Sequence, residues 1–152
     1  MRLDEYVDSE LLISDLSAST HPFKEDVLAE LVGLVCARYE NLDAKNILQV
    51  LHDRESLGST GIGDGIAIPH AKIFGLEKMI LVVARSIDGV AFEALDARPV
   101  RAVFMVLAPE NAVGMHLRLL AHVSRLLKDK EFRQTFMQAT DHETLFALLA
   151  KS

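Results

Sequence analysis

Apolar residues recur with a helical period in the first part of the chain. After Pro22, which suits a first helical turn, they lie three and four positions apart and predict an amphipathic helix. The residues of this stripe are Leu28, Leu31, Val32, Val35 and Cys36. A second helix is predicted from about Asp43, a suitable N-cap, to Glu55. Residues 1–20 mix short apolar runs with serines and indicate an extended lead-in.

The middle of the chain has the patterns of β-strands. Ile66–Ala71 alternates between side-chain types, but Pro69 confines this stretch to the end or edge of a strand. Met79–Ser86 is rich in β-branched residues, and Asp88–Gly89 after it is a hairpin-turn signal, with a strand continuing beyond. Val100–Leu107 is almost entirely apolar, which is typical of a central strand.

The last third of the chain returns to a helical period. One long apolar stripe and one shorter stripe are formed by Leu119, Leu120, Val123, Leu126 and Leu127, and by Phe132, Phe136 and Met137. Thr140–Glu143 fits a capping box before a further helix. Helices, then strands, then helices predict an α/β fold: a single-domain sandwich over residues 1–152, with helices covering the sheet.

Composition narrows the classes of function. The net charge is −6, there is no tryptophan, and no run of lysine or arginine stands out, so we expect no binding to nucleic acid. The apolar runs are short, the N-terminus is acidic, and we therefore expect neither membrane insertion nor a secretory signal. A single cysteine excludes an internal disulfide, and a cytoplasmic location is the default. Cys36 is interpreted as a packing residue.

Two features could bind an anion near the end of the second helix. Arg54 is in helical register with Ile47 and Leu51, so its guanidinium must find an anion or extend out to solvent. The segment Gly58–Gly65 has four glycines in eight residues and predicts a loop. The backbone amides of such a loop suit phosphate oxygens, although a plain flexible connection is the alternative.

Two histidines add possible chemistry. His70 follows a proline at the end of a predicted strand, where active sites collect. His116 shares a helical face with Leu119 and Val123 and should point inwards. Imidazole is a good nucleophile near neutral pH, and arginine matches phosphate geometry, so these residues suggest a phosphoryl-transfer site. The remaining histidines, which we interpret as structural or exposed, are His21, His52, His122 and His142.

The sequence around these residues resembles a known family. Arg54-Glu55 followed by Ser59-Thr-Gly-Ile-Gly-Asp-Gly-Ile-Ala-Ile-Pro-His70 is similar to the signature of type-2 enzyme IIA domains of the bacterial phosphoenolpyruvate:sugar phosphotransferase system. This family includes fructose, mannitol and nitrogen-regulatory proteins. The resemblance extends through Ala94–Val100 and His116–Leu120 and covers nearly the whole chain.

The resemblance implies a fold, a reaction and partners. The family fold is a mixed β-sheet covered by α-helices on both faces. His70 would accept a phosphoryl group from the phosphohistidine of an HPr-type phosphocarrier, and Arg54 and His116 would stabilise it. The loop residues expected to contact phosphate are Ser59, Thr60, Gly61 and Gly63. The downstream partner would be a cysteine on a IIB domain or a regulatory target protein, and no cofactor or metal is expected.

Alternatives remain at the level of the sequence. Because no IIB or IIC segment is attached, we expect the nitrogen-regulatory branch, in which phosphorylation regulates other proteins. A fructose-type IIA that feeds sugar uptake is the alternative. More remote possibilities are a metal-dependent hydrolase using His70 and His116, and an interaction module that no longer transfers phosphate.

Overall fold

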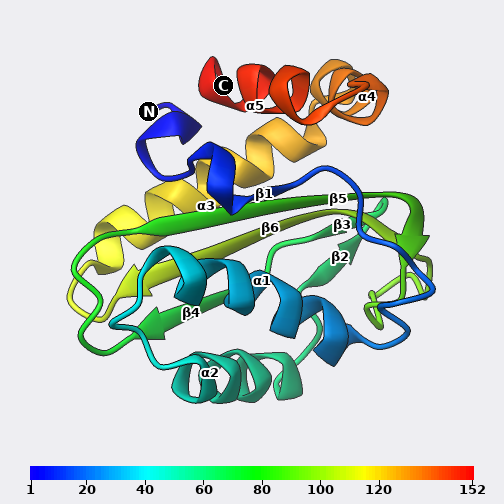
Figure 1. The fold of residues 1–152 in the computed structure, drawn as a ribbon. Helices are drawn as coiled ribbons and strands as arrows, with labels where there is room; N and C mark the ends of the chain where they lie inside the picture. The colour runs from blue at the N-terminus through cyan, green and yellow to red at the C-terminus, as the bar shows by residue number, and fades with distance from the viewer.

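The computed structural model describes all residues, 1–152, as a mixed β-sheet between two layers of helices (Figure 1). The six strands are β1 (Leu12–Ile13), β2 (Gly61–Gly63), β3 (Ile66–Ala67), β4 (His70–Ile73), β5 (Ile80–Val90) and β6 (Val100–Pro109). Their order is β1-β5-β6-β3-β2, and β4 also pairs with β6. The α/β sandwich with a mixed sheet covered on both faces is therefore confirmed.

Two helices cover one face of the sheet and three cover the other (Figure 1). The first pair is α1 (Lys24–Arg38) and α2 (Ala44–Ser56), and the second group is α3 (Val113–Lys128), α4 (Lys130–Gln138) and α5 (His142–Ala150). Strands β5 and β6 lie at the centre, and their apolar side chains are buried because helices cover both sides. None of the five helices is long and apolar enough to cross a bilayer.

The N-terminal segment is less extended than the sequence predicted. It contains two short 3₁₀ turns, at Leu3–Glu5 and Ser9–Leu11, before the two-residue strand β1. Helix α1 begins at Lys24 with Phe23 as its N-cap, so Pro22 lies just outside it. The prediction for Asp43 is confirmed, since its side chain caps α2 by accepting a hydrogen bond from the amide of Lys45.

Strands β3 and β4 follow one another along the same edge of β6, and both run parallel to it. Pro69 separates them, as expected of a residue with no amide proton to donate. Its carbonyl still accepts a hydrogen bond from the amide of Val106. His70 is the first residue of β4 and lies opposite Val106 in the register, which places it beside the central strand.

The hairpin turn predicted at Asp88–Gly89 is not there. Strand β5 continues through both residues to Val90, with an irregular register after Arg85, and residues 91–99 form the connection to β6. Gly89 has a φ of 89°, and a Cβ on it would lie 2.7 Å from Pro99 Cβ. The glycine is thus needed for a close approach inside an irregular strand, and not for a turn.

The tight hairpin lies instead within the predicted glycine-rich loop. Gly61–Gly63 forms strand β2, which pairs antiparallel with β3, so the expectation of a loop throughout residues 58–65 was wrong. Asp64 and Gly65 join the two strands with φ values of 57° and 76°. Two positive φ values are what a type I′ hairpin requires, and Asp-Gly is well suited to it.

Two smaller expectations concern a helix cap and the cysteine. Helix α5 is capped by the side chain of Asp141, which accepts from the amide of Thr144, so the cap lies one residue after the predicted Thr140. Cys36 is partly buried against the core, in agreement with a packing role, and burial raises the pKa of its thiol.

A buried arginine joins the central strand to the C-terminal helices. The side chain of Arg85 is 3% exposed, and burial lowers the pKa of its guanidinium. Nε donates to the carbonyl of Ser14 at 2.9 Å, and Nη1 donates to the carbonyls of Phe136 and Ala139 at 2.8 and 2.7 Å. The last two carbonyls belong to the end of α4, so this one side chain holds α4 against β5.

We expect Arg85→Met to lower the free energy of unfolding by about 3 kcal/mol, because it leaves buried carbonyl oxygens without donors. Urea denaturation measures this difference. The matched control is Arg118→Met at an exposed helical position, which should change stability by no more than about 0.5 kcal/mol. Equal effects of the two substitutions would show that the buried hydrogen bonds contribute nothing specific.

Candidate functional site

The imidazole of His70 is held in one orientation by its own strand. The ring is half-buried, and Nδ1 lies 2.9 Å from the carbonyl oxygen of Ile68. A carbonyl oxygen can only accept, so Nδ1 carries the proton of the neutral ring. Nε2 is then left with an unprotonated lone pair, which is the nucleophilic form of imidazole.

Arg54 lies in the last turn of α2, directly beside that lone pair. Its Nε donates to Nε2 of His70 at 3.3 Å, and its Nη1 donates to the carbonyl of Gly58 at 2.9 Å. The sequence left open whether the guanidinium of Arg54 extends into solvent or binds an anion. It is half-buried and occupies a position from which it could reach an anion on His70. A guanidinium stays protonated at any physiological pH, so the site always contains this positive charge.

His116 closes the other side of the site from the first turns of α3. Its ring is 5% exposed, and its centroid is 5.8 Å from that of His70, with the rings at 67°. Burial lowers the pKa of His116, and electrostatic interactions with the neighbouring His70 and Lys72 lower it further. His116 is therefore neutral at pH 7. The inward orientation predicted from its helical face is confirmed.

One atom of His116 has no partner. Nε2 is the only buried side-chain nitrogen or oxygen in the protein that makes no hydrogen bond. Buried polar atoms are nearly always paired, and an unpaired one calls for an explanation. An oxygen of a group bound to the neighbouring His70 ring would supply the missing partner.

A cavity of about 200 Å³ opens in front of Arg54 and His70. It lies between the end of α2, the β2–β3 region and α3, and its lining residues are Arg54, Ser59, Thr60, Ile62, Ile68, His70, Leu120 and Ser124. Ile62 in this lining is exposed, and so are Leu57 and Leu117, which are close in sequence to the lining residues Ser59 and Leu120. The ring of His70 therefore faces an open, partly apolar surface and not an enclosed small-molecule pocket.

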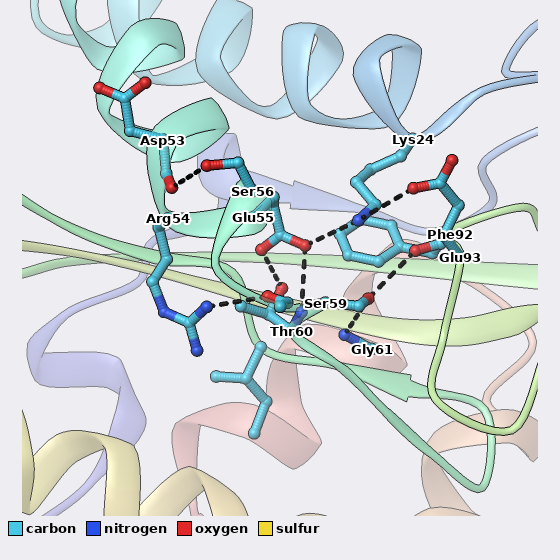
Figure 2. Close-up of polar contacts among 12 residues, drawn as sticks. Lys24, Asp53, Arg54, Glu55, Ser56, Ser59, Thr60, Gly61, Phe92 and Glu93 are labelled. Carbon is cyan, nitrogen blue, oxygen red and sulfur yellow. Dashed lines mark hydrogen bonds and ion pairs between the residues drawn. The ribbon is translucent and has the colours of Figure 1, made fainter.

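A buried carboxylate organises the segment between Arg54 and His70 (Figure 2). Glu55 Oε1 accepts from the amide of Thr60 at 3.0 Å and from Lys24 Nζ at 3.1 Å, and Oε2 accepts from the hydroxyl of Thr60 at 2.5 Å. Glu55 and Lys24 are both more than nine-tenths buried. Lys24 also lies 3.5 Å from Glu93 and above the ring of Phe92.

These bonds change the interpretation of the glycine-rich segment. The hydroxyl protons of Ser59 and Thr60 go to the carbonyl of Phe92 and to Glu55, and the amide of Gly61 donates to Ser59 Oγ. The amide of Asp64 likewise donates to Asp96. Protein acceptors thus take the donors that were expected to be free for phosphate. Contacts of phosphate with Ser59, Thr60, Gly61 and Gly63 stay predictions, and several would require these bonds to be exchanged.

Sequence reasoning missed Glu55 and Lys24 as site-organising residues. A signal for Glu55 was present, because Ile47, Leu51 and Glu55 are spaced four apart and all three are buried. Arg54, one residue earlier, lies at the border of that stripe. No comparable signal marks Lys24, since its partner is 31 residues away in the sequence.

The other histidines have local roles or none. The ring of His21 is bonded to the carbonyl of Ser17, and that of His122 to the carbonyl of Ser152, so His122 is less solvated than expected. His52 is exposed on α2. The protein contains no group of three or more histidine, cysteine, aspartate or glutamate residues placed to hold a metal ion.

We expect Glu55→Gln to lower the free energy of unfolding by about 3 kcal/mol, because it leaves the buried ammonium of Lys24 without its main counter-ion. Urea denaturation measures the loss. Glu25→Gln, at an exposed position on α1, is the control with the same change of charge. Adding Lys24→Met to Glu55→Gln should restore part of the stability, since it removes the unpaired charge. If the double variant loses the sum of the stabilities lost by Glu55→Gln alone and by Lys24→Met alone, the pair is not coupled.

Comparison with known proteins identifies the family of the chain. Residues 5–152 match the family described as "Phosphoenolpyruvate-dependent sugar phosphotransferase system, EIIA 2". A nitrogen regulatory protein of Bradyrhizobium diazoefficiens is 34% identical over 99% of this chain and 95% of its own length. A fructose-specific EIIA component of the phosphotransferase system of Haloferax volcanii is 35% identical over 84% of this chain and 83% of its own.

A solved structure is also similar to this protein in its fold. The crystal structure of nitrogen regulatory protein IIA-Ntr from Neisseria meningitidis has a TM-score of 0.85 at 31% identity, covering 95% of this chain and 97% of that one. Together with the match over residues 5–152, this shows that the chain belongs to the type-2 enzyme IIA family of the phosphoenolpyruvate-dependent sugar phosphotransferase system, whose domains are phosphotransferase components.

Proposed function

We propose that the protein is a phosphohistidine carrier that accepts a phosphoryl group from an HPr-type phosphocarrier on Nε2 of His70. The observation that carries the proposal is the state of this ring. Nδ1 is bound to the carbonyl of Ile68, and Nε2 lies beside Arg54 and the open cavity. One nitrogen is thus reserved for orientation and the other is available for bond formation.

The bond-forming step needs only the imidazole of His70 and the donor phosphohistidine. The lone pair of His70 Nε2 attacks the phosphorus atom of the donor phosphohistidine as the donor's nitrogen–phosphorus bond breaks. The donor's imidazole leaves with that electron pair, and the proton of His70 stays on Nδ1, which donates it in a hydrogen bond to the carbonyl of Ile68. Phosphoryl transfer depends mainly on such in-line positioning and on stabilising charge at the phosphoryl oxygens.

Arg54 and His116 are placed to stabilise those oxygens. The Nε–H of Arg54 points to the position of the new bond and can turn from His70 Nε2 to an oxygen of the phosphoryl group. His116 is buried and neutral, and an N–H at its unpaired Nε2 would donate to a second oxygen. Donors that are already in place when charge develops lower the barrier without reorganisation.

The surroundings of the site favour protein partners. Ile62 at the cavity and Leu57 and Leu117, near site residues in the sequence, are exposed apolar side chains on which another protein can pack and exclude water from the transferring group. An HPr-type carrier would bind here as donor, and a IIB domain or a regulatory target would bind as the next partner. We place this exchange in the cytoplasm.

Within the family, we propose the nitrogen-regulatory type. The nitrogen regulatory relative from Bradyrhizobium matches almost the full length of both chains, and the solved nitrogen regulatory structure covers nearly all of this one. The alternative is transfer to a cysteine of a separate IIB domain, as in sugar uptake. The fructose-specific relative, whose sequence identity to this chain is about the same, supports it. Incubating the phosphorylated protein with a fructose IIB domain distinguishes the two, since only the fructose type should transfer its phosphate rapidly.

We expect His70→Ala to abolish phosphorylation by phosphoenolpyruvate, enzyme I and an HPr-type carrier, because no other residue offers a lone pair in this position. The wild-type label should be labile to acid and stable to base, as a phosphoramidate is, and ¹⁵N NMR should place it on Nε2. His52→Ala, which removes an exposed histidine from α2, should be labelled normally. One phosphate per chain in His70→Ala would refute the assignment.

We expect His116→Gln to transfer phosphate faster than His116→Ala, because glutamine retains an N–H donor. The alanine variant should be slower than wild type by about threefold to tenfold, corresponding to one neutral hydrogen bond. Single-turnover transfer from a phosphorylated HPr-type carrier gives the rates, and thermal melts give the stability of each variant. If rate and stability fall in proportion in both variants, His116 only packs the core.

An independent measurement on the wild type accompanies these variants. In the free protein, the electrostatic influence of His70 contributes to the lowered pKa of His116. A phosphoryl dianion on His70 reverses that contribution, so the pKa of His116 should rise on phosphorylation. The Cε1–H resonance of His116 followed against pH should therefore titrate at higher pH in the phosphorylated protein.

A further inference from the structure

Two adjoining cavities are lined by residues of the β2–β3 hairpin, the start of β6 and α4. They share four lining residues, which are Asp64, Gly65, Arg101 and Arg133. One cavity, of about 380 Å³, has no hydrophobic residue in its lining. The other, of about 390 Å³, has five, which are Ile66, Ala102, Leu127, Phe136 and Met137. We call the two together the basic cleft.

Four cationic side chains surround the basic cleft, and none is neutralised. They are Arg98, Arg101, Lys130 and Arg133. None of these four side chains forms an ion pair, because all ion pairs in the protein involve other basic residues. None of the four side chains donates a hydrogen bond either. The chain carries only 16 lysines and arginines against 22 acidic residues, so their gathering here runs against the overall charge.

The acidic groups near the cleft do not cancel this charge. Asp64 is the one acidic residue in the lining, against four basic ones. Asp96 lies close by, but its carboxylate accepts hydrogen bonds from the backbone amides of Asp64 and Arg98. The guanidinium groups are left without an anionic partner, and arginine binds phosphate oxygens in a bidentate manner.

We propose that the basic cleft binds a nucleotide that carries a di- or triphosphate. The phosphates would occupy the polar cavity between Arg98, Arg101 and Arg133, and the base and ribose would lie in the neighbouring apolar cavity over Ile66 and Met137. A bare phosphate would leave the apolar cavity unfilled. A single ligand that has both a polyanionic end and a ring-shaped body uses both cavities and the arginines they share.

The basic cleft is separate from the phosphoryl-transfer site. In the register of β6, Ala102 lies opposite Ile66 and Val106 lies opposite His70. Four residues of strand correspond to about 13 Å. No residue lines both the basic cleft and the cavity at His70. A nucleotide in the cleft would therefore leave His70 accessible, and the inference stands whether or not His70 is the phosphoryl acceptor.

The test is a titration of the ¹⁵N-labelled full chain with ATP, followed by NMR. Binding in the cleft should shift the amides of Gly65 and Ala102 and the Nε–H signals of Arg98, Arg101 and Arg133, while His70 and His116 keep their resonances. Saturable shifts confined to these residues support the proposal. Absence of shifts at millimolar ATP, or shifts spread over all exposed basic residues, would overturn it.

Variants and competing probes identify what is recognised. Arg101→Gln combined with Arg133→Gln should weaken ATP binding about tenfold or more, and thermal melts should show an intact fold. Arg118→Gln, an exposed arginine outside the cleft, removes one charge and should change affinity by less than about twofold. An equal loss in Arg118→Gln overturns the site. Pyrophosphate that binds as tightly as ATP, or a glutamate-rich peptide that binds more tightly, overturns the assignment to a nucleotide.

Discussion

The arrangement of the proposed phosphoryl-transfer site depends on one buried ion pair, between Glu55 and Lys24. The carboxylate joins the N-terminal end of α1, the C-terminal end of α2 and the start of the β2–β3 hairpin in a single set of hydrogen bonds. Arg54 is the residue before this carboxylate, and the hairpin leads directly to Pro69 and His70. A site whose two main groups come from different elements requires such a fixed point, because small displacements reduce transfer strongly.

The helices, strands and turns show which parts of the fold the sequence could predict and which it could not. Spacing of apolar residues located all five helices, and Val100–Leu107 was correctly predicted as a central strand because both its faces are covered. The turn signal was ambiguous because the dipeptide Asp-Gly occurs twice, at residues 64–65 and 88–89. Only the first of these forms a hairpin turn. The difference lies in tertiary contacts, since Pro99 packs closely against Gly89.

For the candidate site, sequence reasoning identified the groups but not their protonation. Arg54, His70 and His116 are brought together from residues 16 and 46 positions apart, as their placement on elements suggested. The tautomer of His70 depends on the carbonyl of Ile68, and the neutral state of His116 depends on its burial. Both are consequences of packing that no spacing rule contains. The occupied donors of the glycine-rich segment likewise follow from Glu55, a buried charge whose partner lies in another helix.

The two cationic regions of the molecule differ in a way that suits different tasks. At His70 there is one permanent positive charge, Arg54, and burial lowers the pKa of the neighbouring His116. If His70 carries a phosphoryl group as proposed, the site must release that group to the next partner, and several fixed cations would hold it too tightly for that. The basic cleft has four cations, an apolar wall and no histidine among its lining residues. Fixed charge without a nucleophile favours equilibrium binding of an intact anion, whereas a nucleophile with modest charge favours a group that is passed on.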